Sequence, residues 1–81
     1  MPRYHFHTED GECLADKEGT ELKDIDAARD TSVQLLAECL KGNSELFWRH
    51  EGFAVIVTDH SGLRLFQLHL GVVESPVAKR H

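Results

Sequence analysis

The sequence predicts an α+β fold, in which an antiparallel sheet of three to four strands packs one face against one long helix, in the order β-β-α-β-β. Three observations predict this fold. Apolar residues recur at helical spacing over residues 25–41, they alternate with polar residues over residues 3–8, and two apolar runs at 53–58 and 63–70 flank a turn. A chain of 81 residues has room for one core, and we assign a single domain to residues 1–70.

The first strand is predicted at residues 3–8. Because side chains alternate across a strand, Tyr4 and Phe6 point to one face of the sheet, and His5 and His7 point to the other. The strand is therefore predicted to be half-buried, with an apolar face toward the core and histidines on the opposite face.

Two turns and a short strand lead from this strand to the helix. Residues 10–11 are Asp-Gly, a strong turn signal, and residues 12–15 are expected to return as a short strand at the edge of the sheet. A second turn is expected at residues 16–19, which end in glycine.

The helix is predicted over residues 25–41, with one broad apolar arc and a polar side opposite it. Asp24 is the expected N-cap, and Gly42 is the expected C′ residue in the left-handed conformation. Ala28 and Ser32 keep the middle of the apolar arc thin, which lets the helix lie close to the sheet. The Ser32 hydroxyl can bond the carbonyl four residues earlier.

Residues 42–52 are predicted to be irregular, with three large apolar side chains that cap an open end of the core: Leu46, Phe47 and Trp48. A hairpin follows, and Gly62 in its turn can take a positive φ. Residues 59–61 are Asp-His-Ser, the residue types of a hydrolase triad. Three adjacent turn residues cannot form the relay of that triad, so the sequence predicts a turn there.

The strand at residues 53–58 is apolar on both faces. Phe53, Val55 and Val57 point one way, whereas Ala54 and Ile56 point the other way. A strand of this kind is central in a sheet and covered on both sides. Since one helix covers one face, Ala54 and Ile56 are predicted to lie in an interface on the helix-free face.

Three occupants of that interface are open: the C-terminal tail at residues 71–81, a second copy of the chain, or a different protein. The tail carries a proline and a polar end, so it is a weak cover and its composition allows it to be mobile. We therefore expect a homodimer. Strand order also stays open, because the strands at residues 3–8 and 53–58 could be adjacent or separated.

Composition limits the function classes. A net charge of −5 and a pI near 5.6 argue against binding of nucleic acid or an anionic membrane, since both need a positive surface. No apolar run approaches the ~20 residues of a membrane span, and no signal-peptide core follows Met1, so we expect a cytoplasmic protein. Cys13 and Cys39 form no CxxC motif and are expected to be reduced thiols.

Six histidines raise the possibility of a metal site. His5 and His7 share one strand face, and His69 joins that face if the apolar residues of the last strand point at the helix. The alternatives are solvated histidines or an interface whose stability depends on pH. Metal binding through His5, His7 and His69 is kept as the second hypothesis.

No paired nucleophile and base, no phosphate-binding glycine pattern and no calcium loop are visible, so we expect no enzyme activity and no cofactor. The first hypothesis is a small non-enzymatic interaction or regulatory module. It would self-associate or bind a protein through the helix-free face of its sheet.

Short motifs over nearly the whole chain also carry a resemblance. They are residues 2–7 (PRYHFH), 18–22 (EGTEL), 27–29 (AAR), 57–59 (VTD), 62–63 (GL) and 65–69 (LFQLH). In this order the motifs resemble a family of short uncharacterised proteins of soil-dwelling alphaproteobacteria such as rhizobia, a domain of unknown function. The resemblance implies a cytoplasmic, single-domain α+β protein, and it implies no reaction, ligand or site.

Overall fold

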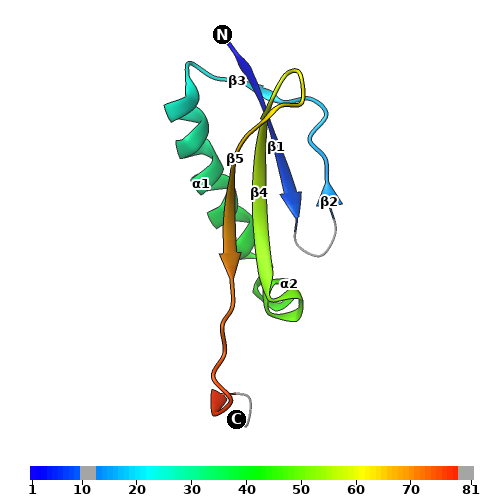
Figure 1. The fold of residues 1–81 in the computed structure, drawn as a ribbon, viewed down its shortest axis with the longest axis vertical. Helices are drawn as coiled ribbons and strands as arrows, with labels where there is room; N and C mark the ends of the chain where they lie inside the picture. Colours follow the sequence, from blue (N-terminus) through cyan, green and yellow to red (C-terminus); the bar gives the residue numbers. More distant parts are fainter. Residues whose placement is uncertain (10–12, 79–81) are drawn as a thin grey trace.

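The computed structural model describes residues 1–9 and 13–78, so the turn predicted at residues 10–11 lies outside the described residues. The chain forms an α+β fold with an antiparallel sheet and two helices (Figure 1). Its elements are β1 (Arg3–Glu9), β2 (Cys13–Leu14), β3 (Thr20–Glu21), α1 (Ile25–Lys41), α2 (Ser44–His50), β4 (Gly52–Asp59) and β5 (Arg64–Gly71). The predicted order of strands and long helix is confirmed, and β3 and α2 are additions to it.

The strands lie in the order β2-β1-β4-β5, and neighbouring strands are antiparallel. Sequence analysis left open whether β1 and β4 are adjacent. They are, with a ladder that runs from Tyr4 opposite Asp59 to Glu9 opposite Ala54. On its other side, β1 pairs first with β3 and then with β2. One outer side of β1 is therefore occupied by two short strands, and β5 is the last strand at the opposite side of the sheet.

The core lies between α1 and one face of the sheet. Across that face, Phe6 lies opposite Val57, and Val57 lies opposite Phe66, so the apolar faces of three strands are in register. Val55 and Val57 are fully buried in the central strand β4. Burying such a side chain contributes roughly 1.5–3 kcal/mol, so this face is the main source of stability.

Helix α1 has the bounds that its sequence pattern predicts, and Asp24 caps it by accepting a hydrogen bond from the Ala27 N–H at 2.9 Å. Ala28 and Ser32 are fully buried, as expected for the thin part of the apolar arc. The Ser32 hydroxyl donates to the Arg29 carbonyl, three residues earlier and not four. The helix therefore sits close to the sheet without leaving this hydroxyl unpaired.

The segment after α1 differs from its prediction in two ways. Gly42 is not left-handed, since its φ is −106°, and residues 44–50, expected to be irregular, form helix α2. A left-handed residue reverses a chain after a helix, whereas here the Asn43 N–H donates to the Leu40 carbonyl, and Asn43 occupies the N-cap position of a second helix without a side-chain capping bond. The left-handed residue is Glu51, with a φ of 54°, at the point where the chain turns from α2 into β4.

The large apolar residues of α2 do only part of what was expected. Phe47 is half-buried and packs against the core, but Trp48 stays 56% exposed. Their rings meet edge to face, with centroids 5.6 Å apart. Among the described residues, neither helix is both long enough and apolar enough to cross a membrane.

The β4–β5 turn is confirmed as a turn. The Asp59 carboxylate accepts hydrogen bonds from the hydroxyl and the N–H of Ser61 and from the N–H of Leu63. These bonds, led by the Ser61 hydroxyl, hold the pKa of Asp59 below its usual value. Gly62 has the predicted positive φ, 89°. The Asp59 carboxylate and the Ser61 hydroxyl thus build a local turn.

Beyond β5, residues 72–78 run away from the sheet (Figure 1). Val73 is fully exposed and Val77 is exposed as well. The described part of the tail therefore does not cover the helix-free face.

Candidate functional site

The two outer edges of the sheet are built differently, and the hydrogen bonds of His5 and His7 lie at the β1 edge. On the outer side of β1, away from β4, no strand of the described residues pairs with β1 between the short strands β2 and β3. Asp16 lies in this gap: its Oδ2 accepts a hydrogen bond from the Phe6 N–H at 3.0 Å, and its Oδ1 accepts from the Gly19 N–H at 3.0 Å. One carboxylate thus takes the place of a strand and satisfies an edge donor of β1.

The hydrogen bonds to Asp16 determine its charge state. Burial alone raises the pKa of Asp16, but the backbone N–H groups of Phe6, Gly19 and Glu18, together with the charge of His5, lower it more. The net result is a pKa below the usual value of an aspartate. A charged carboxylate is therefore part of the folded edge.

The backbone of Asp16 binds both histidines of β1. Its N–H donates to His7 Nδ1 at 3.0 Å, and its carbonyl lies 2.8 Å from His5 Nδ1. A backbone N–H can only donate, so His7 Nδ1 bears no proton, and the ring proton sits on Nε2, 3.1 Å from Thr58 Oγ1. A carbonyl can only accept, so His5 Nδ1 bears a proton. The two rings stack with centroids 6.3 Å apart.

The third candidate metal ligand does not join this pair. His7 on β1 lies opposite Ile56 on β4, which in turn lies opposite Gln67 on β5. His69 lies opposite Ala54, so it is two strands away from His7 and two residues further along the sheet. Strand and residue spacings place the His7 and His69 Cα atoms about 12 Å apart. In the part of the chain that the structure describes, no group of three His, Cys, Asp or Glu side chains could hold a metal ion. Both His7 nitrogens already make structural hydrogen bonds.

Gly19 completes the closed edge. It has a φ of 73°, and a Cβ placed on it would lie 2.9 Å from the Tyr4 carbonyl oxygen and 3.0 Å from the His5 ring. Backbone cannot move away as a flexible side chain can, so this position requires glycine. We call the set formed by Asp16, Gly19, His5, His7 and Thr58 the Asp16 network.

The helix-free face is the face of the sheet that lies opposite α1, and it contains the predicted interface residues Ala54 and Ile56. Both are buried within the single chain, at 4% and 8% exposure. Their cross-strand neighbours are long polar side chains: Glu9 and His69 beside Ala54, and His7 and Gln67 beside Ile56. The chain's own polar residues thus flank this apolar strip. The prediction that Ala54 and Ile56 contact a partner is untested and stays a prediction.

The β5 edge, the outer side of Arg64–Gly71, is the open counterpart of the β1 edge. Among the described residues, β5 pairs only with β4. Leu65 and Leu70 are each 38% exposed, and Phe66 and Leu68, which face the core, are only half-buried. A β-bulge interrupts the ladder beside Leu65. The edge therefore offers both unpaired backbone groups and apolar surface.

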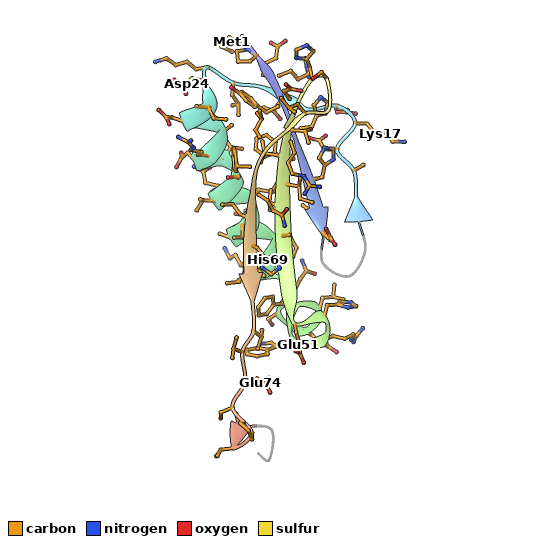
Figure 2. The ribbon with its side chains drawn as sticks, in the orientation of Figure 1. Met1, Lys17, Asp24, Glu51, His69 and Glu74 are labelled. Atoms are coloured by element: carbon orange, nitrogen blue, oxygen red, sulfur yellow. The ribbon has the colours of Figure 1, made fainter. Side chains whose placement is uncertain are left out.

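A shallow hollow of about 370 Å³ adjoins this edge on the helix-free face. Figure 2 shows His69 on β5 and Glu51 after α2, toward the same end of the sheet. The hollow is lined by Glu9, His50, Glu51, Gly52, Phe53, Ala54, Gln67 and His69. A smaller hollow of about 210 Å³ lies at the other end and includes His5, His7 and His60. The larger hollow thus extends over β1, β4 and β5 at the α2 end of the helix-free face.

Comparison with known proteins gives a family. The sequence profile of DUF6894, a domain of unknown function, matches residues 3–71. The chain belongs to the DUF6894 family. The match begins at the first residue of β1 and ends at the last residue of β5, so the DUF6894 domain is the whole sheet with its two helices. No curated protein and no solved structure matches the chain.

Within this DUF6894 domain, sequence reasoning treated Asp16 and Gly19 only as turn residues and did not foresee the Asp16 network. An Asp followed three residues later by Gly was the available signal, because an aspartate side chain commonly accepts a hydrogen bond from a nearby backbone N–H in a turn. The bonds from Asp16 to β1 had no such signal, since they join residues that lie nine to eleven positions apart.

Proposed function

We propose that this DUF6894 protein is a small non-enzymatic interaction or regulatory module. It self-associates or binds a protein through the helix-free face of its sheet and the β5 edge that borders this face. The carrying observation is the contrast between a β1 edge covered by the chain itself and an eight-residue β5 edge that no other strand of the described residues pairs with. An open edge strand presents backbone donors and acceptors that an added strand can pair with.

The side chains of this surface fit the same function. Gln67 and His69 are exposed on the helix-free face, next to the hollow, whereas Ala54 and Ile56 lie beneath this polar layer. An added strand would bond to the β5 backbone, and its side chains would reach the hollow. In this arrangement, Ala54 lines the hollow, and Ile56 lies opposite Gln67 and supports the strand that carries the contacts.

The setting we propose is the bacterial cytoplasm, as the family resemblance implied. The net charge of −5 makes a protein partner more favourable than nucleic acid or an anionic membrane. The charge of the β5 strand differs from that of the chain, since Arg64 is its only Lys, Arg, Asp or Glu residue. This strand is thus suited to contact with another polypeptide.

The test compares two double variants that add the same charges. The edge variant is Gln67→Lys/His69→Lys, and the control variant is Gln34→Lys/His60→Lys, which changes the same residue types on α1 and in the β4–β5 turn. All four side chains are exposed. We expect the wild type and the control variant to self-associate in light scattering, or to select binding peptides from a random displayed library, and the edge variant to do neither. A wild type that does neither contradicts the proposal.

A further inference from the structure

We propose that the partner of the β5 edge is a second copy of this chain, joined by antiparallel pairing of the two β5 strands into one continuous sheet. The inference rests on the proposed interaction function and names its partner and its surface. Three observations on β5 carry it: its missing charges, the pattern of its side chains and its half-covered apolar face.

The first observation is that β5 lacks the residues that keep edge strands apart. Exposed edges are usually blunted by lysine, proline or inward-pointing charges. Over residues 66–71 β5 carries no proline and no Lys, Arg, Asp or Glu, although these four charged types make up 28% of the chain. Its one charged residue, Arg64, lies at the start of the strand, so antiparallel copies place the two Arg64 side chains at opposite ends of the interface.

The second observation is that the regular part of β5 is complementary to itself. Beyond the bulge, residues 66–71 pair with β4 without interruption. An antiparallel pair related by a two-fold axis at Leu68 places Leu68 opposite its symmetry mate and Phe66 opposite Leu70 of the other copy. On the helix-free face the same register places Gln67 opposite His69. Apolar residues meet apolar residues, and no like charges lie opposite each other.

The third observation is that the core is incompletely covered at this edge. Phe66 and Leu68 pack against the core but are only partly buried, and Leu70 on the same face is 38% exposed. A second copy would continue the sheet beyond β5 and place its own Phe66, Leu68 and Leu70 next to them. The transfer of this surface from water is the driving force that backbone hydrogen bonds alone do not supply.

A second copy fits these features better than an unrelated strand. A two-fold pair uses the same strand twice, so the apolar strip and the open backbone of both copies are satisfied together. An unrelated strand would need a matching apolar strip of its own, and its binding would not explain why β5 is complementary to itself. The experiment must therefore distinguish a second copy from an unrelated strand.

The experiment measures mass by light scattering at two concentrations roughly a hundredfold apart, and amide hydrogen exchange by NMR at the same concentrations. We expect the wild type and the control variant Gln34→Lys/His60→Lys to double in mass at the higher concentration. The edge variant Gln67→Lys/His69→Lys should stay a monomer. In the wild type, exchange of the outward-facing β5 amides should slow at least about tenfold with dimer formation, while β1 amides stay unchanged.

Each other result overturns the inference. Pairing of β5 between copies is excluded by any of three results. The wild type stays a monomer, the edge variant still forms the dimer, or the β5 amides of the dimer are unprotected. A monomer that still selects displayed peptides, with selection lost in the edge variant, overturns the second copy but leaves the proposed interaction function in place. A monomer that selects no peptide overturns both.

Discussion

The two outer sides of the sheet solve the same problem in opposite ways. A strand at the end of a sheet exposes unpaired N–H and C=O groups. On the outer side of β1, the chain covers these groups with β2, β3 and the carboxylate of Asp16. On the outer side of β5 no such cover exists among the described residues. Among the described residues, the fold therefore covers the outer side of β1 and leaves the outer side of β5 uncovered.

The comparison also assigns separate roles to the histidines. His5 and His7 belong to the covered edge, where the Asp16 backbone holds both rings. His69 belongs to the open edge and lines the larger hollow. The covered edge should thus determine stability, and the open edge should determine association. The following predictions test this separation, from the largest effect to the smallest.

The largest effect is expected at Gly19. Gly19→Ala should lower the free energy of unfolding by about 3 kcal/mol, because an alanine is strained at a φ of 73° and its Cβ would meet the Tyr4 carbonyl. Urea unfolding followed by circular dichroism measures this change.

Two other glycines serve as controls. Gly62 has a positive φ, but the space where a Cβ would lie is open, so Gly62→Ala should lower the free energy of unfolding by about 1 kcal/mol. Gly42 has neither a positive φ nor a close neighbour, so Gly42→Ala should change this free energy by less than about 0.5 kcal/mol. Equal effects at all three positions would show that the close approach to Tyr4 is unimportant.

The next effect is expected at Asp16. Asp16→Ala removes the acceptor of the Phe6 and Gly19 N–H groups, and the free energy of unfolding should fall by about 2 kcal/mol. The loss is smaller than for fully buried N–H groups because water can reach part of the site. The control is Asp30→Ala, since Asp30 is exposed on α1 and bonds only Gln34 among the described contacts. If both substitutions cost the same in urea unfolding, the carboxylate does not replace a strand.

The Asp16 carboxylate should also make the stability of the fold depend on pH. The pKa of Asp16 is lower in the folded chain than in the unfolded chain, so its contribution is complete above the unfolded value of about 4 and is lost as the pH falls through the folded value. The Tm of the wild type should therefore drop toward that of Asp16→Asn as the pH is lowered from 7 to below about 4. A constant difference in Tm across this range would contradict the prediction.

How far the fold follows from the sequence depends on whether the signal is local. Helix α1 has both a periodic apolar arc and a cap at Asp24, and its bounds were predicted correctly. The β4–β5 hairpin has a turn signal between two apolar runs, and it too was predicted. Helix α2 is short, and its apolar residues are adjacent, so it lacks the periodicity that marks a helix. Its start at Asn43 depends on contacts with the end of α1.

The site could be predicted less well than the fold. The faces of Ala54 and Ile56 follow from alternation along a strand, but their burial depends on which side chains flank them, and that depends on strand order. His5 and His7 share a face as predicted, while the pairing of β1 with β4 separates them from His69. Strand order is a long-range property, and no short stretch of the sequence encodes it.

The smallest effect is expected for the edge variant Gln67→Lys/His69→Lys, measured on the monomer. At a concentration where light scattering gives a monomer, its free energy of unfolding should differ from the wild type by less than about 0.5 kcal/mol, because both side chains are exposed and the Arg64–Gln67 contact is solvated. A loss above about 1 kcal/mol would mean that the β5 surface helps to hold the single chain together. A near-zero value next to the losses at Gly19 and Asp16 would separate the two edges, one required for folding and one free to bind.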